Sequence, residues 1–213
     1  KKILVNGLTK KSSYSVCEHD EIYIDDDSFS VDEILPEEMD IPILYEDDDI
    51  LVVNKPSGLL VHPTYRRRSG TLVNFLISLN IPLSTINSAE RMGIVHRLDE
   101  DTSGALIVAK NDQSHVKLQN LFKNHLVEKH YRAIVEGRCN EENYTIETGI
   151  TRDLRNRKKM AVSENGKNAI SIFNTLILTE NNTYMDVKIE TGRTHQIRVH
   201  AAYSKHPVVG DKI

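Results

Sequence analysis

The sequence predicts an α+β fold built on a mostly antiparallel mixed sheet that is flanked by helices. Strand-like apolar runs outnumber helix-like ones, and the links between neighbouring strand-like runs are short and hairpin-like. One run near the C-terminus alternates between apolar and polar residues. Such alternation is typical of an antiparallel strand with one face in water.

The first strand and helix are expected between residues 43 and 79. The run DILVVNKP predicts a strand that ends at Lys55-Pro56, and Ser57-Gly58 then turns the chain. Gly70-Thr71 can cap a helix, because the residues that follow place apolar side chains at helical spacing. These apolar positions are Leu72, Phe75, Leu76 and Leu79.

A buried strand is expected at ALIVAKN, residues 105–111, followed by a second helix. Asp112 can cap that helix. Its apolar side is expected to carry Leu118, Leu121, Phe122 and His125.

Three more strands and a closing helix complete the expected fold. The strands are residues 131–137, 168–178 and 183–191, and the last two are joined by a turn at Asn181-Asn182. In the last strand the residues Met185, Val187 and Ile189 alternate with Asp186, Lys188 and Glu190. Gly192 breaks this strand, and Thr194 can cap the helix HQIRVHAAYS.

The chain divides into three parts by composition. Residues 1–24 predict two short strands with a turn at Asn6-Gly7, a piece too short to fold alone. Residues 25–42 are acidic and contain two prolines, so we interpret them as a linker with solvated acids. Residues 43–213 form the main domain.

Bulk composition limits the possible classes of protein. The 213 residues are 39% hydrophobic, and no apolar run reaches the length of a membrane span. Cys17 and Cys139 form no CxxC pair and no Cys/His cluster, which predicts a reduced cytoplasmic protein without a metal site. The motifs of nucleotide hydrolysis, hydride transfer and serine-esterase chemistry are missing.

Charge is distributed unevenly along the chain. Residues 1–50 hold fifteen acids and four bases, whereas residues 51–213 hold sixteen acids and twenty-three bases. The bases cluster in TYRRRSG (64–70) and in TRDLRNRKKM (151–160). Two such runs in a basic domain predict phosphate binding, and arginine beside tyrosine suits stacking on the bases of RNA. The bases expected to bind are Arg66, Arg67, Arg68, Arg155, Arg157, Lys158 and Lys159.

The stretch HRLDEDTSG (96–104) holds three acids with different expected roles. Asp101 and the TSG that follows suit a turn, and Glu100 is expected to be solvated. Asp99 follows the apolar Leu98 and is expected to point partly inward, where its charge needs a cationic partner. Candidate partners are Arg97, Arg91 and an arginine of GRTHQIRVH (192–200). These residues alone leave two alternatives open, a catalytic acid and a structural ion pair.

Four stretches in order resemble the motifs of the RluA-type RNA pseudouridine synthase family. They are YEDDDILVVNKPSGLLVHP, HRLDEDTSGALIVAKN, EKHYRAIVEG and GRTHQIRVHAAYSKHPVVGD. The resemblance covers residues 43–213 and implies that the catalytic domain is truncated at its C-terminal end. Residues 1–24 resemble the end of a small RNA-binding domain that precedes this domain in many members.

The resemblance implies an enzyme that isomerises uridine to pseudouridine in RNA without a cofactor or metal. It matches Asp99 to the essential aspartate, as a nucleophile or a base at the ribose, and Arg193 to the arginine paired with it. Tyr131 matches the active-site tyrosine, Arg97 a residue that fills the space of the flipped nucleotide, and Ile197 the uracil pocket. His96 is a candidate substrate-binding residue, although the main role expected for His96 and Thr102 is to support the loop at residues 96–104.

The resemblance suggests a substrate and a cellular location, and two alternative functions are considered beside it. Ribosomal RNA is favoured over tRNA as the substrate, and a monomer in the cytoplasm is expected. An RNA chaperone that has lost the chemistry is one rival, and the presence of Asp99, Tyr131 and Arg193 speaks against it. A base-excising glycosidase is another, but it would need a second facing acid that the sequence does not supply.

Overall fold

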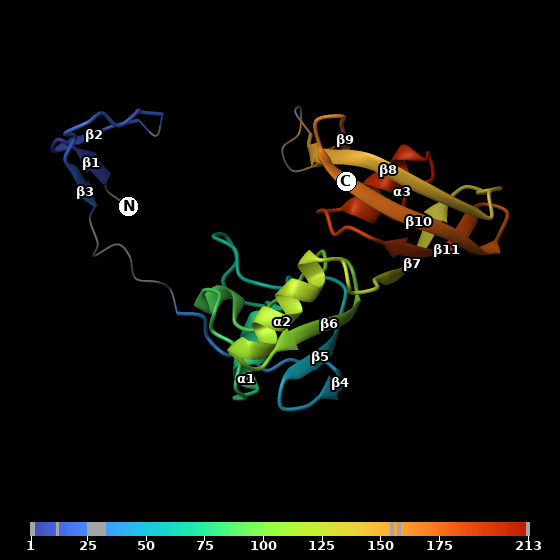
Figure 1. Ribbon diagram of the computed structural model, residues 1–213, viewed down its shortest axis with the longest axis horizontal. Helices are drawn as coiled ribbons and strands as arrows, with labels where there is room; N and C mark the ends of the chain where they lie inside the picture. Colours follow the sequence, from blue (N-terminus) through green and yellow to red (C-terminus); the bar gives the residue numbers. More distant parts are fainter. Residues whose placement is uncertain (1–2, 12, 25–32, 154–155, 157–158, 212–213) are drawn as a thin grey trace.

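A computed structural model describes residues 3–11, 13–24, 33–153, 156 and 159–211 of the chain. These residues form three sheets and three α-helices (Figure 1). Every pairing between the named strands is antiparallel. The predicted α+β class is therefore confirmed.

The first sheet lies within residues 3–24. Strands β1 (Ile3–Val5), β2 (Leu8–Thr9) and β3 (Ile22–Ile24) pair in the order β2-β1-β3, so the prediction of two strands was one short. The predicted turn at Asn6-Gly7 is confirmed, since both residues have the positive φ that a two-residue hairpin needs. Within this sheet only Val5 is buried, so it has almost no core of its own.

Part of the predicted acidic linker packs against the next lobe. Ile34 and Ile41 are buried in the core of that lobe. Both carboxylate oxygens of Glu37 accept the backbone N–H of Gly70 at 3.0 Å. Of the predicted linker, residues 25–42, the part 25–32 lies outside the described residues. Residues 33–42 pack on the lobe and do not form a free linker, although Glu38 and Asp40 are exposed as expected.

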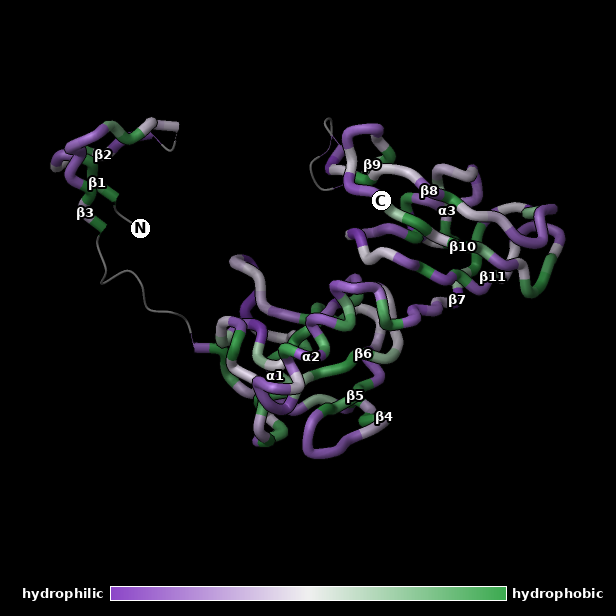
Figure 2. The backbone as a smooth tube through the Cα atoms, in the orientation of Figure 1, coloured by the Kyte–Doolittle hydropathy of each residue, from purple (hydrophilic) through white to green (hydrophobic). Residues whose placement is uncertain are grey.

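The first lobe, residues 33–126, contains a three-stranded sheet of order β4-β5-β6. The strands are β4 (Ile43–Glu46), β5 (Ile50–Lys55) and β6 (Gly104–Ala109), with helices α1 (Leu72–Ser78) and α2 (Asp112–Lys123) and the short 3-10 helix η2 (Ala89–Arg91). Its core includes Leu51, Val53, Leu72, Leu76, Leu106 and Val108, which are fully buried. In Figure 2 the green colour along β5 and β6 marks the hydrophobic residues of these two strands.

The two helices of this lobe test the predicted caps. Helix α1 begins after Thr71 as expected, and the Asn74 side chain accepts hydrogen bonds from the N–H and the hydroxyl of Thr71. Helix α2 is capped by Asn111, one residue before the predicted Asp112, because the Asn111 side chain accepts the Ser114 N–H.

The predicted apolar side of α2 was partly wrong. Leu118 and Phe122 are half-buried, but Leu121 is exposed and His125 lies beyond the helix with a positive φ. The fully buried side chain of α2 is instead that of His115, whose Nε2 lies 3.1 Å from the side-chain amide of Asn87. Tertiary hydrogen bonding thus decided the buried face.

The second lobe, residues 128–211, contains a five-stranded sheet of order β7-β11-β10-β8-β9. Its elements are β7 (His130–Glu136), β8 (Asn143–Arg152), β9 (Met160–Val162), β10 (Lys167–Leu178), β11 (Asn182–Ile189) and helix α3 (Gln196–Tyr203). The alternation predicted for β11 is confirmed, because Met185, Val187 and Ile189 are buried. Strands β8 and β9 were missed.

Each lobe has its own hydrophobic core, and Tyr131 packs against both. This tyrosine lies on β7, the strand that follows directly from the connection between the lobes (Figure 1). No helix among the described residues is long and apolar enough to cross a membrane.

Candidate active site at the junction of the lobes

The loop that carries Asp99 is held through its backbone by the turn after β5. Lys55 Nζ donates to the Glu100 carbonyl at 3.0 Å, and the Gly58 N–H donates to the same oxygen at 2.9 Å. Ser57 Oγ donates to the Asp101 carbonyl at 2.8 Å. These bonds fix the main chain at Glu100 and Asp101 and leave the side-chain carboxylate of the preceding Asp99 available.

Lys55 is a fully buried lysine, which is rare unless its charge is paired or its hydrogen bonds are met. Its ammonium donates to the carbonyls of Pro56 and Leu59 at 2.8 Å as well as to that of Glu100, so all three protons are used. Burial lowers the pKa of Lys55, and the nearby charges of Asp101, Glu100 and Asp99 oppose that shift.

Asp99 is paired across the junction with residues of the second lobe. Its Oδ2 lies 3.5 Å from Nη1 of Arg198 and 3.9 Å from Nε2 of His195, and its side chain is 21% exposed. The expectation that this acid points partly inward and has a cationic partner agrees with this geometry. The partner, however, is Arg198 and not Arg193.

Arg198 is itself held by a second carboxylate. Its Nε and Nη2 donate to the two oxygens of Asp211 at 2.7 and 2.5 Å, a bidentate arrangement that fixes the plane of the guanidinium. Asp211 is 10% exposed, and its hydrogen bond raises the pKa of Arg198 further. Nη1 remains directed at Asp99.

His195 precedes helix α3 in a left-handed conformation, with φ of 56°. It takes the N-cap position that was predicted for Thr194. Its buried Nδ1 finds no hydrogen-bond partner among the described residues. Burial lowers the pKa of His195, and the charge of Asp99 opposes this. His195 and Arg198 are three residues apart, so they reach the same carboxylate from one side of the helix start.

The loop before α3 is shaped by Gln196. Its Oε1 accepts the Thr191 hydroxyl at 2.7 Å and the Arg193 N–H at 3.0 Å, and its Nε2 donates to the Ile170 carbonyl at 2.9 Å. Gln196 is buried, so these bonds are shielded from water. They fix the direction in which the first turn of α3 leaves the sheet.

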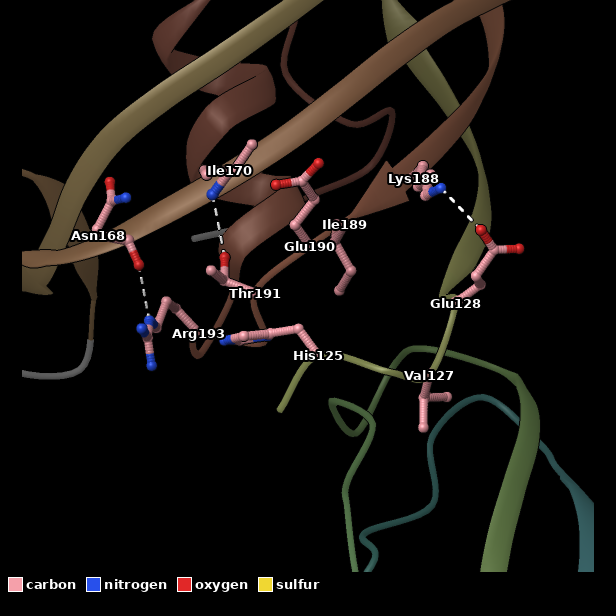
Figure 3. A pocket seen from close by; sticks show the side chains of 10 residues that line it. All are labelled: His125, Val127, Glu128, Asn168, Ile170, Lys188, Ile189, Glu190, Thr191 and Arg193. Carbon is pink, nitrogen blue, oxygen red and sulfur yellow. Dashed lines mark hydrogen bonds and ion pairs between the residues drawn. The ribbon is translucent and has the colours of Figure 1, made fainter. Parts of the chain in front are cut away.

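Arg193 points to a different place from the one predicted. Its Nε donates to the Asn168 carbonyl at 2.9 Å, and the side chain lines a pocket of about 500 Å³ on β10 and β11 (Figure 3). His125 and Glu128 also line this pocket. The prediction failed because Arg193 stands before the N-cap, whereas Arg198 stands inside the helix that faces Asp99.

Tyr131 closes the site from β7. It is paired with Val187 of β11, and it packs against both cores. Burial raises the pKa of its phenol, and the charge of Asp99 adds to the shift. The phenol therefore stays neutral near physiological pH.

The remaining predicted residues of the site have distinct surroundings. His96 Nε2 accepts the Ile107 N–H at 3.0 Å and its ring stacks on Phe122, while burial lowers its pKa to about 4. This neutral ring supports the loop, as expected. Arg97 is exposed, and Ile197 packs against the core of the second lobe.

The first basic run is partly neutralised by acids. Arg67 Nη1 contacts Glu100 Oε1 at 2.8 Å, and Arg68 contacts Glu90, while Arg66 is exposed. Glu100 is exposed, as expected, and in addition it forms this ion pair at the surface. Of the second run, Arg155, Arg157 and Lys158 lie outside the described residues, and Lys159 is half-buried.

The site brings together Asp99 from the second of the four motifs, the partly buried Tyr131 from the third and Arg198 from the fourth. A family profile described as RNA pseudouridylate synthase matches residues 49–203. The chain belongs to this family, and the resemblance found in the sequence is confirmed.

Relatives and solved structures agree with this membership. The chain is 43% identical over 210 residues to "Uncharacterized RNA pseudouridine synthase YlyB" of Bacillus subtilis (strain 168), covering 99% of this chain and 69% of that protein. It is 43% identical over 212 residues to "Ribosomal large subunit pseudouridine synthase D" of Borreliella burgdorferi, covering 97% of this chain and 65% of that protein. The chain thus spans about two thirds of the length of these relatives.

Two human structures share the fold. "Human RNA Pseudouridylate Synthase Domain Containing 1" superposes with a TM-score of 0.68 and 31% identity, covering 81% of this chain and 68% of that one. "Human RNA Pseudouridylate Synthase Domain Containing 4" gives a TM-score of 0.62 at 26% identity, covering 79% and 67%.

Proposed function

We propose that this protein converts uridine to pseudouridine in RNA, in ribosomal RNA rather than tRNA, as a cytoplasmic monomer. Membership of the pseudouridylate synthase family supports the reaction. The name of the Borreliella relative supports ribosomal RNA. The reaction is an isomerisation: the bond from N1 to the ribose breaks, the base turns, C5 bonds to the ribose, and the C5 proton is exchanged for one on N1.

Asp99 is the group that acts at the ribose, as a nucleophile or as a base. Both roles use the side-chain carboxylate, and Nη1 of Arg198, 3.5 Å from its Oδ2, holds that carboxylate at the junction of the lobes. Nη1 of Arg198 can also follow the carboxylate as its charge changes during the reaction. Asp211 keeps the arginine in place during these steps.

The target base must leave the RNA stack before Asp99 can reach its ribose, at a cost of a few kcal/mol. Tyr131 and Ile197 are partly buried against the core of the second lobe and offer apolar surface to the uracil ring. Arg97, two residues before Asp99 and exposed, can occupy the space that the base vacates. The exposed Arg66 and the basic run at residues 152–159 contact the phosphate backbone.

The observation that carries the proposal is the Asp99–Arg198–Asp211 arrangement at the junction of the lobes. The test is release of tritium from C5 of uracil in RNA taken from a strain that lacks the enzyme. Wild type is expected to release tritium, and Asp99→Asn, which keeps the shape but loses the charge, is expected to release none. Glu100→Gln is the matched control and should stay active. Equal release by wild type and Asp99→Asn would contradict the proposal.

A further inference from the structure

A tight turn at residues 64–67 projects an aromatic side chain, that of Tyr65, into solvent. Tyr65 is 92% exposed, which is unusual for a side chain that is commonly half-buried. The Thr64 N–H donates to the Arg67 carbonyl at 2.9 Å, and the Arg67 N–H donates back to the Thr64 carbonyl at 3.2 Å. Thr64 Oγ1 accepts the same N–H at 3.2 Å. Tyr65 is therefore presented at the tip of a closed turn.

This turn is tied to the loop that carries Asp99. Arg67 Nη1 contacts the Glu100 carboxylate at 2.8 Å, while Nη2 donates to the Gly70 carbonyl at 3.2 Å. Glu100 follows Asp99 directly, and its own carbonyl is held by Lys55 and Gly58. The turn is thus joined to the loop of Asp99 by this exposed ion pair.

Of the three arginines at residues 66–68, Arg66 is the one that can bind a ligand without first breaking an ion pair. Arg67 and Arg68 each face a carboxylate, Glu100 and Glu90 respectively. Arg66 is exposed and forms no ion pair with any residue that the structure describes. The tip therefore combines one exposed ring with one exposed guanidinium.

We propose that Tyr65 and Arg66 form a binding site for one unpaired base of the RNA and the phosphate beside it. The proposal rests on the proposed function, because extruding a uridine leaves a neighbouring base without its stacking partner. An aromatic ring stacks on any base, and an arginine contacts the backbone. The Arg67–Glu100 pair connects this site to Asp99.

The test uses a short single-stranded RNA with one 2-aminopurine, whose fluorescence falls when the base stacks. Wild type and Tyr65→Phe are expected to quench the fluorescence alike, since both rings can stack. Tyr65→Ala is expected to bind roughly tenfold more weakly and to lose the quenching. Tyr203→Ala, which removes an exposed tyrosine from α3, is the matched control and should behave as wild type.

Salt dependence separates the two members of the site. Arg66→Ala is expected to lower the slope of log affinity against log salt concentration by about 0.7, the value for one phosphate contact on a single strand. Tyr65→Ala should weaken binding and leave that slope unchanged, because stacking involves no counterion. A slope for Tyr65→Ala that falls as much as that for Arg66→Ala would overturn the assignment of the ring as a stacking group.

Three other results would overturn the proposal: wild-type affinity in Tyr65→Ala, equal losses in Tyr65→Phe and Tyr65→Ala, or the same loss on a fully paired duplex. Tritium release is measured separately. Tyr65→Ala should raise the RNA concentration for half-maximal release and keep the rate at saturation. If wild type quenches 2-aminopurine but releases no tritium, the proposed function fails and the stacking site stands.

Discussion

The two lobes hold their halves of the site by different kinds of contact. In the first lobe, the loop around Asp99 is fixed through main-chain carbonyls that accept hydrogen bonds from Lys55 and the turn after it. In the second lobe, Arg198 is fixed by the carboxylate of Asp211. The first half therefore depends on one buried cation, and the second depends on one pair of opposite charges.

The largest effect is expected in the first lobe, from Lys55→Met. This change leaves the buried carbonyl of Leu59 and the carbonyls of Pro56 and Glu100 without this donor, at a cost of about 3 kcal/mol in the free energy of unfolding. Urea denaturation measures it. The control is Lys188→Met, which removes a surface ion pair with Glu128 and should cost less than about 1 kcal/mol. Equal stability of the two variants would mean that the loop is not held by Lys55.

Asp211→Asn tests the second lobe. The variant loses one charge of the bidentate pair, so Arg198 is free to turn toward Asp99 or away from it. We expect kcat to fall about tenfold or more while the KM for RNA changes little, because the contact acts on the reacting carboxylate and not on RNA binding. Asp186→Asn, which alters a pair with Arg132 and His130 on the sheet surface, should keep kcat. A rise in KM alone would contradict the assigned role.

In each lobe the sequence predicted some elements and missed others, for physical reasons. Strand β6 and helix α1 follow from local patterns of apolar residues, and Asp99 could be singled out from its neighbours. Strand β8 was missed, although Tyr144, Ile146 and Ile150 alternate with polar residues, because Thr and Gly interrupt the pattern. Gly149 is required there, since a side chain would collide with the Ser163 carbonyl.

The partner of Asp99 could not be chosen from sequence alone. GRTHQIRVH offers two arginines, and the choice depends on where helix α3 begins. Gln196 sets that point through bonds to Thr191 and the Ile170 carbonyl, which are tertiary contacts. Asp211 was not recognised as the anchor of Arg198, because it lies thirteen residues further along the chain.

A third prediction concerns one histidine in each lobe, the half-buried His96 and the fully buried His200. Burial lowers the pKa of His96 and of His200 to about 4. The unfolded chain binds protons at both below about pH 6.5, but the folded chain does so only near pH 4, so stability should fall as pH falls through this window. Each histidine should cost roughly 2 kcal/mol at pH 5 relative to pH 7.

Urea denaturation of His96→Gln and His200→Gln at pH 7, 6 and 5 separates the lobes. Each variant should lose its own share of the pH dependence and keep the other share. If one variant removes the whole dependence, the other histidine is protonated without unfolding. If neither changes it, carboxylates are responsible instead.

The smallest effect is expected for the Arg67–Glu100 pair, the side-chain contact that joins the basic turn to the loop of Asp99. Both side chains are more than two-fifths exposed, so the pair should contribute less than about 1 kcal/mol to the free energy of unfolding. A double-mutant cycle with Arg67→Ala and Glu100→Gln measures the coupling, and 0.5 M salt should reduce it. A coupling as large as the effect of Lys55→Met would mean that side chains, and not the main chain, hold the loop of the first lobe. The two lobes would then be built alike.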